Sequence, residues 1–170
     1  MNMIDAVKSC FRQYVGFGGR ARRSEYWFWT LFTILAGIVL GVFDGLLFGW
    51  ESTDVGVFGT LFSLATFLPG LAVSWRRLHD TGRSGWWVGG FYLALIGVGI
   101  LIGAMAFATM GVGASSEGIF AGIGVITIVA LIAAIGYAIL MLVFFCQPSQ
   151  SGPNKYGPNP IDGGVAQLFE

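Results

Sequence analysis

Four long apolar runs, almost free of charge, constrain the fold of this chain more than any other feature of its sequence. They cover roughly residues 26–49, 55–75, 86–113 and 119–146, and only Asp44 places a charge inside one of them. A helix rising ~1.5 Å per residue needs about 20 residues to cross a hydrocarbon core of ~30 Å, and each run is long enough. Charged residues make up 11% of the chain, too few to cover a water-facing surface. The sequence therefore predicts an all-α integral membrane protein, a four-helix bundle.

The positions of the basic residues predict how the four spans are threaded. All nine Lys and Arg residues precede the first run, lie between the second and third, or follow the fourth. The connections on the opposite side carry Glu51, Asp54 and Glu117 and no cation. Basic loops stay in the cytoplasm, so we expect both termini and the 76–87 loop there. The first run is too long for a signal-peptide core and lacks a small-residue cleavage site, so we expect it to remain as an anchor.

Three parts of the chain follow from this threading. Residues 1–25 form a cytoplasmic amphipathic segment, 26–146 the four-span transmembrane domain, and 147–170 a cytoplasmic tail rich in Gly, Pro and Asn. The first segment carries apolar residues at helical spacing, which predicts a short helix that either lies in the headgroup layer or packs on the loops as a soluble helix. The tail repeats the triplet GPN, typical of turns; a docking tail and an ordered lid both remain open.

Aromatic and small residues mark the ends and faces of the spans. Ser24 is placed to cap the first span, and Arg76 and Arg77 to end the second. Glycines four apart leave one face of the first span without side chains, which predicts close helix packing within the bundle or in a homo-oligomer. The residues expected in the interfacial aromatic belt are Tyr26, Trp27, Trp29, Trp75, Trp86 and Trp87. The helix-packing glycines are Gly37, Gly41, Gly45 and Gly49.

Charged residues concentrate in two segments at the same predicted depth, beside the first span and after the second. We expect them to cluster, with arginine–carboxylate pairs joining the segments through Glu25 and Asp80. Arginines whose donors are all used in such pairs would have a structural role, whereas arginines outside the pairs could bind anionic headgroups. The candidate lipid- or partner-binding residues are Arg20, Arg22, Arg23, Arg76, Arg77, His79, Asp80 and Arg83.

Other function classes find little support. GRSG at 82–85 resembles the motif of intramembrane serine proteases, but His79 lies on the same hairpin and is the single histidine, so no catalytic residue is predicted. One histidine and two distant cysteines, Cys10 and Cys146, offer no metal-ligand spacing. A transporter would need a carboxylate near the bilayer centre, and Asp44 is expected closer to the outer interface, within reach of water. A transporter or channel, and an enzyme acting on a phosphate-containing substrate, stay as alternatives.

Three motifs together resemble a known family. FRQYVGFGGRARRSEYWFWTLF (11–32), SWRRLHDTGRSGWW (74–87) and GPNKYGPNP (152–160) occur in this order, separated by apolar spans. They resemble the bacterial inner-membrane proteins catalogued as domain of unknown function 805. The resemblance implies a small multi-pass protein of the bacterial inner membrane, and it carries no activity, cofactor or catalytic residue.

These observations favour a non-enzymatic membrane protein that binds or scaffolds through an Arg- and Trp-rich cytoplasmic face. Its expected partners are the bilayer and anionic lipid headgroups, or a protein, with a homo-oligomer left open. No nucleic acid, metal or cofactor is expected.

Overall fold

The computed structural model describes residues 1–49, 56–112 and 116–161, with the side chains of 105 and 108–123 left out of the description. Within these ranges the chain is all-helical and has no strand. The five helices are α1 (Met3–Arg12), α2 (Arg23–Phe48), α3 (Val57–Asp80), α4 (Trp86–Val112) and α5 (Ser116–Cys146). The predicted outer connections carry residues that the structure does not describe: Glu51, Asp54 and the side chain of Glu117.

Among the described residues, four segments are long and apolar enough to cross a membrane, which confirms the predicted number of candidate spans. They are Arg23–Phe48, Val57–Asp80, Trp86–Ala104 and Gly124–Cys146. The first and third apolar runs begin close to the predicted positions. The helix of the second apolar run, α3, continues to Asp80, five residues beyond the predicted end of the run at Trp75. Arg77 lies in its last turn, as predicted, but Arg76 and Arg77 are buried in ion pairs.

The prediction that Ser24 caps the first span is wrong. The helix already includes Arg23, and Arg22, in extended backbone, occupies the N-cap position without a side-chain hydrogen bond. Glu25 still lies in the first turn, where the helix dipole favours an anion. The sequence RSGWW (83–87) is similar to RSEYW (23–27). The helix begins at Trp86 in the first of these and already at Arg23 in the second.

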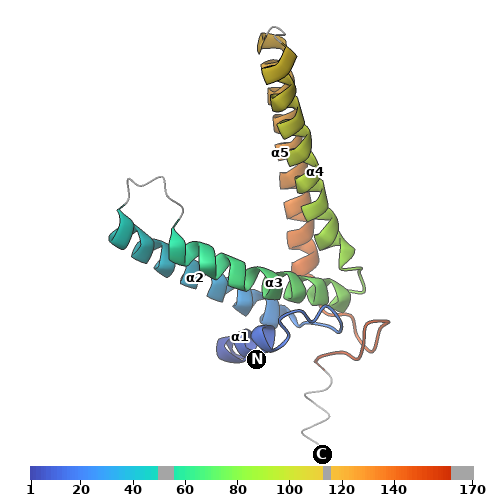
Figure 1. Cartoon of the computed structure of the whole chain (residues 1–170). Helices are drawn as coiled ribbons and strands as arrows, with labels where there is room; N and C mark the ends of the chain where they lie inside the picture. The colour runs from blue at the N-terminus through green and yellow to red at the C-terminus, as the bar shows by residue number, and fades with distance from the viewer. Residues whose placement is uncertain (50–55, 113–115, 162–170) are drawn as a thin grey trace, which may run out of the picture. The chain divides into compact units, whose positions relative to one another are not determined.

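The chain divides into two compact units, Met1–Gly85 with Phe145–Glu170, and Trp86–Phe144. In the first unit, α2 and α3 form a hairpin, and α1 lies against both (Figure 1). A small core of buried residues joins the three helices: Cys10, Ala21, Trp29 and Val73. We call the part of this unit where α2 begins and α3 ends the polar end of the hairpin. The N-terminal helix and the described tail both pack there.

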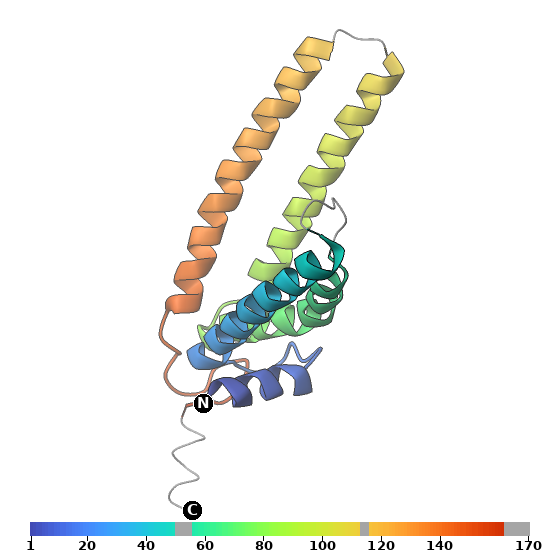
Figure 2. The same ribbon diagram turned by 90° about the vertical axis from the view of Figure 1, so that its left-hand side faces the viewer.

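In the second unit, α4 and α5 run side by side as a second hairpin (Figure 2). Large aromatic side chains join them near one end. Phe91 stacks on Tyr137 with ring centroids 5.1 Å apart, and the Tyr137 hydroxyl donates to the Trp87 carbonyl. Between the helices, small residues that include Gly90, Ala94 and Ala134 leave a cavity of about 190 Å³. Apart from the Tyr137 hydroxyl, the side chains around it carry no polar group.

The glycine face of α2 makes no close helix contact at the two positions that can be tested. A methyl group added at Gly37 or Gly41 would meet no described atom within 4 Å. Gly49 has a different role, because its positive φ of 84° ends the helix while its N–H donates to the Gly45 carbonyl. Packing through the glycine face therefore stays a prediction.

Asp44 closes the far end of the α2–α3 hairpin. We expected this carboxylate near the outer interface, within reach of water, but the residue is only 6% exposed. Its two oxygens accept hydrogen bonds from the N–H groups of Phe58 (3.1 Å) and Gly59 (2.8 Å) in the first turn of α3. Asp44, which lies in α2, thus caps the N-terminus of α3. Gly56 permits this approach, because a Cβ there would lie 2.4 Å from the carboxylate.

Replacing Asp44 should weaken the hairpin in proportion to the acceptors lost. Asp44→Ala removes both acceptors and should cost about 1–2 kcal/mol of unfolding free energy, measured by detergent-induced unfolding in micelles. Asp44→Asn keeps one carbonyl oxygen and should lose less. Wild-type stability of Asp44→Ala would contradict this capping role.

Candidate functional site

The predicted polar residues meet at the polar end of the hairpin, where three of the arginines are buried. Arg76 is 1% exposed, Arg77 0% and Arg20 9%. Asp80, also completely buried, is the last residue of α3. A buried charge is tolerated only when it is paired and hydrogen-bonded, so the partners of these side chains determine the local structure.

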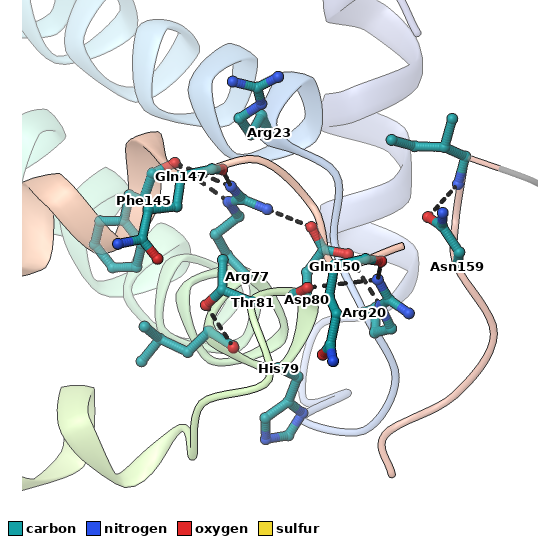
Figure 3. A network of polar contacts seen from close by, with 12 residues as sticks. Arg20, Arg23, Arg77, His79, Asp80, Thr81, Phe145, Gln147, Gln150 and Asn159 are labelled. Carbon is teal, nitrogen blue, oxygen red and sulfur yellow. Dashed lines mark hydrogen bonds and ion pairs between the residues drawn. The ribbon is translucent and has the colours of Figure 1, made fainter. Parts of the chain in front are cut away.

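Asp80 lies between two guanidinium groups (Figure 3). Its Oδ1 accepts from Arg20 Nε at 3.0 Å, and its Oδ2 accepts from Arg77 Nη1. The remaining Arg20 donors bind the tail, with Nη1 donating to Gly152 O (2.7 Å) and Nη2 to Gln150 O (2.6 Å). One carboxylate therefore joins the loop before α2, the end of α3 and the tail.

Arg77 holds the beginning of the tail. Its Nε and Nη2 donate to the Phe145 carbonyl at 3.3 and 3.2 Å, and Nη2 also donates to the Gln147 carbonyl. The last carbonyls of a helix have no partner within it, and here a buried arginine from α3 supplies the donors. Arg77 therefore holds Phe145 and the first residue of the tail, Gln147, against the end of α3.

A second ion pair joins α1, α2 and α3. Arg76 Nη1 donates to Glu25 Oε1 at 3.0 Å, and the same oxygen accepts from Ser9 Oγ at 3.0 Å. Arg76 Nε and Nη2 have no hydrogen-bond partner among the described atoms. Cys10 lies beside this pair, and burial, with the Glu25 charge as a second cause, raises the pKa of its thiol to about 12.

The expectation of arginine–carboxylate pairs between the two charged segments is confirmed by Arg20–Asp80 and Arg76–Glu25. The remaining candidate arginines lie nearer the surface. Arg23 is exposed, and its Nη1 donates to the Cys146 carbonyl at 3.5 Å; Arg22 is half-buried. Arg83, also half-buried, donates to Gln147 Oε1 at 2.5 Å. The cluster thus divides into a buried set and a more exposed set.

His79 connects the tail to the loop before α2. Its Nδ1 lies 3.2 Å from the Gly19 carbonyl, and its ring stacks on Tyr156 with centroids 3.7 Å apart and planes within 4°. Asn154 Nδ2 donates to the His79 carbonyl at 2.9 Å, and the backbones of Asn154 and Gly157 exchange two hydrogen bonds of 3.0 Å. The described part of the tail is therefore ordered against the polar end of the hairpin, and its role as a docking tail or a lid stays a prediction.

The aromatic residues differ in position. Trp27, Trp86 and Trp87 are 37%, 65% and 43% exposed, and their place in an interfacial belt stays a prediction. The belt prediction is wrong for Trp29, which is only 3% exposed and packs in the core under α1. Its ring centroid lies 5.2 Å from that of Phe11.

Trp75 and Tyr26 have packing roles as well. The Trp75 ring contacts Phe17 and lies so close to Gly85 that a Cβ there would come within 2.1 Å of its indole nitrogen. Tyr26 contacts Phe145 with ring centroids 4.3 Å apart. Both side chains hold neighbouring segments against the helix ends.

Two groups that could act in catalysis, Asp80 and His79, are already engaged. Asp80 is buried between two arginines, and His79 is occupied by Gly19 and Tyr156. In the described part of the chain, no group of three or more His, Cys, Asp or Glu residues could hold a metal ion. The geometry therefore assembles a structural polar cluster.

Sequence reasoning missed the tail and α1 residues that complete this cluster. Ser9 and Gln150 carried no charge or motif that linked them to the arginines, and the GPN triplet that contains Asn154 predicted only a turn. The repeated GPN triplets were the available signal, since Gly152 and Gly157 take positive φ values and form the turns that present carbonyls to Arg20.

Comparison with known proteins gives the same assignment as the sequence motifs. A family model described as protein of unknown function (DUF805) matches residues 14–158. The chain belongs to this family. Its relatives include the Escherichia coli K12 inner membrane proteins YhaH, 35% identical over 92% of this chain and 97% of the relative, and YhaI, 35% identical over 91% and 94%. No solved structure matches the chain.

Neutralising Asp80 should be among the most damaging single changes at this end of the hairpin. Asp80→Asn leaves Arg20 and Arg77 buried without a counter-charge, and breaking a buried pair in this way costs about 3–5 kcal/mol. Unfolding in detergent micelles would measure the loss. Asp5→Asn, the same change on an exposed side chain of α1, is the matched control and should remain near wild type. Equal stability of the two variants would disprove the role of Asp80.

Cys10 should be unreactive in the folded protein. Its thiol is buried, and its pKa of about 12 keeps it protonated at neutral pH, whereas the thiolate is the nucleophile. In a Cys146→Ser background, maleimide should label Cys10 only after denaturation. Rapid labelling of the native protein would show that α1 does not cover this site.

Proposed function

We propose that this protein is a non-enzymatic binding element of the bacterial inner membrane and that its ligand is the headgroup of anionic phospholipid in the cytoplasmic leaflet. In this proposal the four spans form a bundle with both termini in the cytoplasm. The distribution of Lys and Arg supports the orientation. The names of the relatives support the inner membrane as the location.

The observation that carries the proposal is the division of the cations into two sets. Arg20, Arg76 and Arg77 are buried and bind carboxylates and backbone carbonyls. They are not available to a headgroup, so the binding role that the sequence suggested for them falls to other residues. The exposed cations of the N-terminal region are Lys8, Arg12 and Arg23, with Arg22 half-buried. We name these four the surface cations.

The position of the surface cations fits a headgroup layer. Arg22 and Arg23 begin α2, and α1 packs against this same end of the hairpin. Trp27, one turn further along α2, is exposed, as is usual for an aromatic residue at a membrane interface. Cations at this depth are attracted to the negative inner leaflet by about 1 kcal/mol each.

The alternatives draw less support from the geometry. A transporter needs a polar pathway, whereas the cavity between α4 and α5 is lined by apolar side chains and the Tyr137 ring. An enzyme acting on a phosphate-containing substrate needs accessible catalytic groups, whereas Asp80 and His79 are engaged in structural contacts. A protein partner, including a second copy of the chain, would compete for the same surface cations.

Removing one surface cation should weaken retention of anionic lipid. Arg23→Gln should bind phosphatidylglycerol roughly fivefold more weakly, as expected for ~1 kcal/mol per cation. Native mass spectrometry of delipidated protein titrated with phosphatidylglycerol or phosphatidylcholine would measure this.

Lys155→Gln provides a matched control for the Arg23 variant. It removes one exposed cation that already lies over the Tyr156 ring, 4.9 Å from its centroid, and it should have a smaller effect. Equal retention of phosphatidylglycerol by wild type and Arg23→Gln would contradict the proposal.

A further inference from the structure

Helix α1 and the turn after it present three different sides. One side is buried against the hairpin, with Ala6 and Cys10 at 0% exposure. A second side carries large apolar residues that the described protein does not cover: Ile4, Phe11 and Val15 are 62%, 42% and 63% exposed. We call these three residues the apolar stripe. A third side carries the cations.

The cations border the apolar stripe around the helix. At 3.6 residues per turn, Lys8 and Arg12 lie one turn apart on one side, and both are exposed. The order around α1 is therefore buried face, apolar stripe, cations. A helix that lies in the plane of a membrane has this composition, with its apolar face among the acyl chains and Lys or Arg directed to the phosphates.

The contacts of α1 place Phe11, a residue of the stripe, farther from the polar end of the hairpin than the buried Arg76–Glu25 pair. Ser9 bonds Glu25, which pairs with Arg76. Two residues later, Phe11 makes edge contacts with Trp29 and Phe32, at 5.2 and 6.5 Å between centroids. Phe32 lies ~10 Å beyond Glu25 along α2, at ~1.5 Å per residue.

The turn after α1 also contacts the hairpin away from its polar end. The Tyr14 hydroxyl donates to the Ala65 carbonyl of α3 at 2.7 Å. Ala65 lies ~16 Å from Arg76 along this helix, inside the candidate span Val57–Asp80. The stripe thus adjoins α2 and α3 at Phe11 and beside Tyr14, at the level of the exposed apolar residues Leu31 (45%) and Leu64 (67%).

We propose that α1 is an interfacial helix that inserts the apolar stripe among the acyl chains of the leaflet at the polar end of the hairpin, while Lys8 and Arg12 reach the phosphates. The occupant of the stripe is lipid, because the stripe lies at the level of exposed apolar residues of α2 and α3 and cations border it. Lys8 and Arg12 also belong to the surface cations, so the inference deepens the proposed function. Insertion of the stripe itself does not require anionic lipid.

Depth-dependent fluorescence quenching tests this inference on the full-length protein. An environment-sensitive fluorophore is attached at Ile4→Cys, Val15→Cys or Lys8→Cys in a Cys146→Ser background, where the buried Cys10 stays unlabelled. The variants are reconstituted in phosphatidylcholine vesicles, with and without doxyl groups near the top of the acyl chains. Because all three substituted side chains are exposed, folding should be retained, and circular dichroism checks it.

The expected result is blue-shifted emission and strong doxyl quenching at positions 4 and 15, with water-like emission and weak quenching at position 8. Water-like emission at 4 and 15 would overturn the inference. So would blue-shifted emission without lipid quenching, since the stripe would then be covered by protein, such as a second copy of the chain. Insertion in pure phosphatidylcholine together with unchanged phosphatidylglycerol retention in Arg23→Gln would support the inference while the proposed function failed.

Discussion

The buried carboxylate of Asp80, placed between Arg20 and Arg77, is the interaction on which the polar end of the hairpin depends. Two guanidinium groups cannot remain buried without a counter-charge. Asp80 supplies it, and the donors left over bind carbonyls at Phe145, Gln150 and Gly152. A single side chain thereby joins three segments that are far apart in the sequence. The described tail is held by these arginines and by the contacts of Tyr156 and Asn154 with His79.

This arrangement explains why an arginine-rich face need not be a binding face. The arginines most prominent in the sequence, Arg76 and Arg77, are among the most buried residues of the protein. In the proposed function, lipid binding belongs to cations outside the ion pairs, such as Lys8, Arg12 and Arg23. Burial of part of the cluster therefore moves the candidate lipid contacts from the loop after α3 to α1 and the first turn of α2.

Predictions from the sequence succeeded where a local pattern of residues has a single physical consequence. Apolar runs of sufficient length predicted the four candidate spans. The expectation that Glu25 and Asp80 pair across the two charged segments was also correct. Predictions failed where a partner from elsewhere in the chain decided the outcome. Trp29 was predicted to lie in the aromatic belt, but α1 covers it. Asp44 was predicted to reach water, but it caps α3.

The sequence by itself determined that the chain is helical and crosses a membrane, because hydrocarbon admits only long apolar segments whose backbone groups are satisfied internally. It also determined the family, through three motifs in a fixed order. Only the tertiary structure decided which arginines are structural. Charge is visible in a sequence, but burial and pairing depend on contacts such as Ser9 with Glu25 and Arg20 with Gly152, which join residues that no local pattern connects.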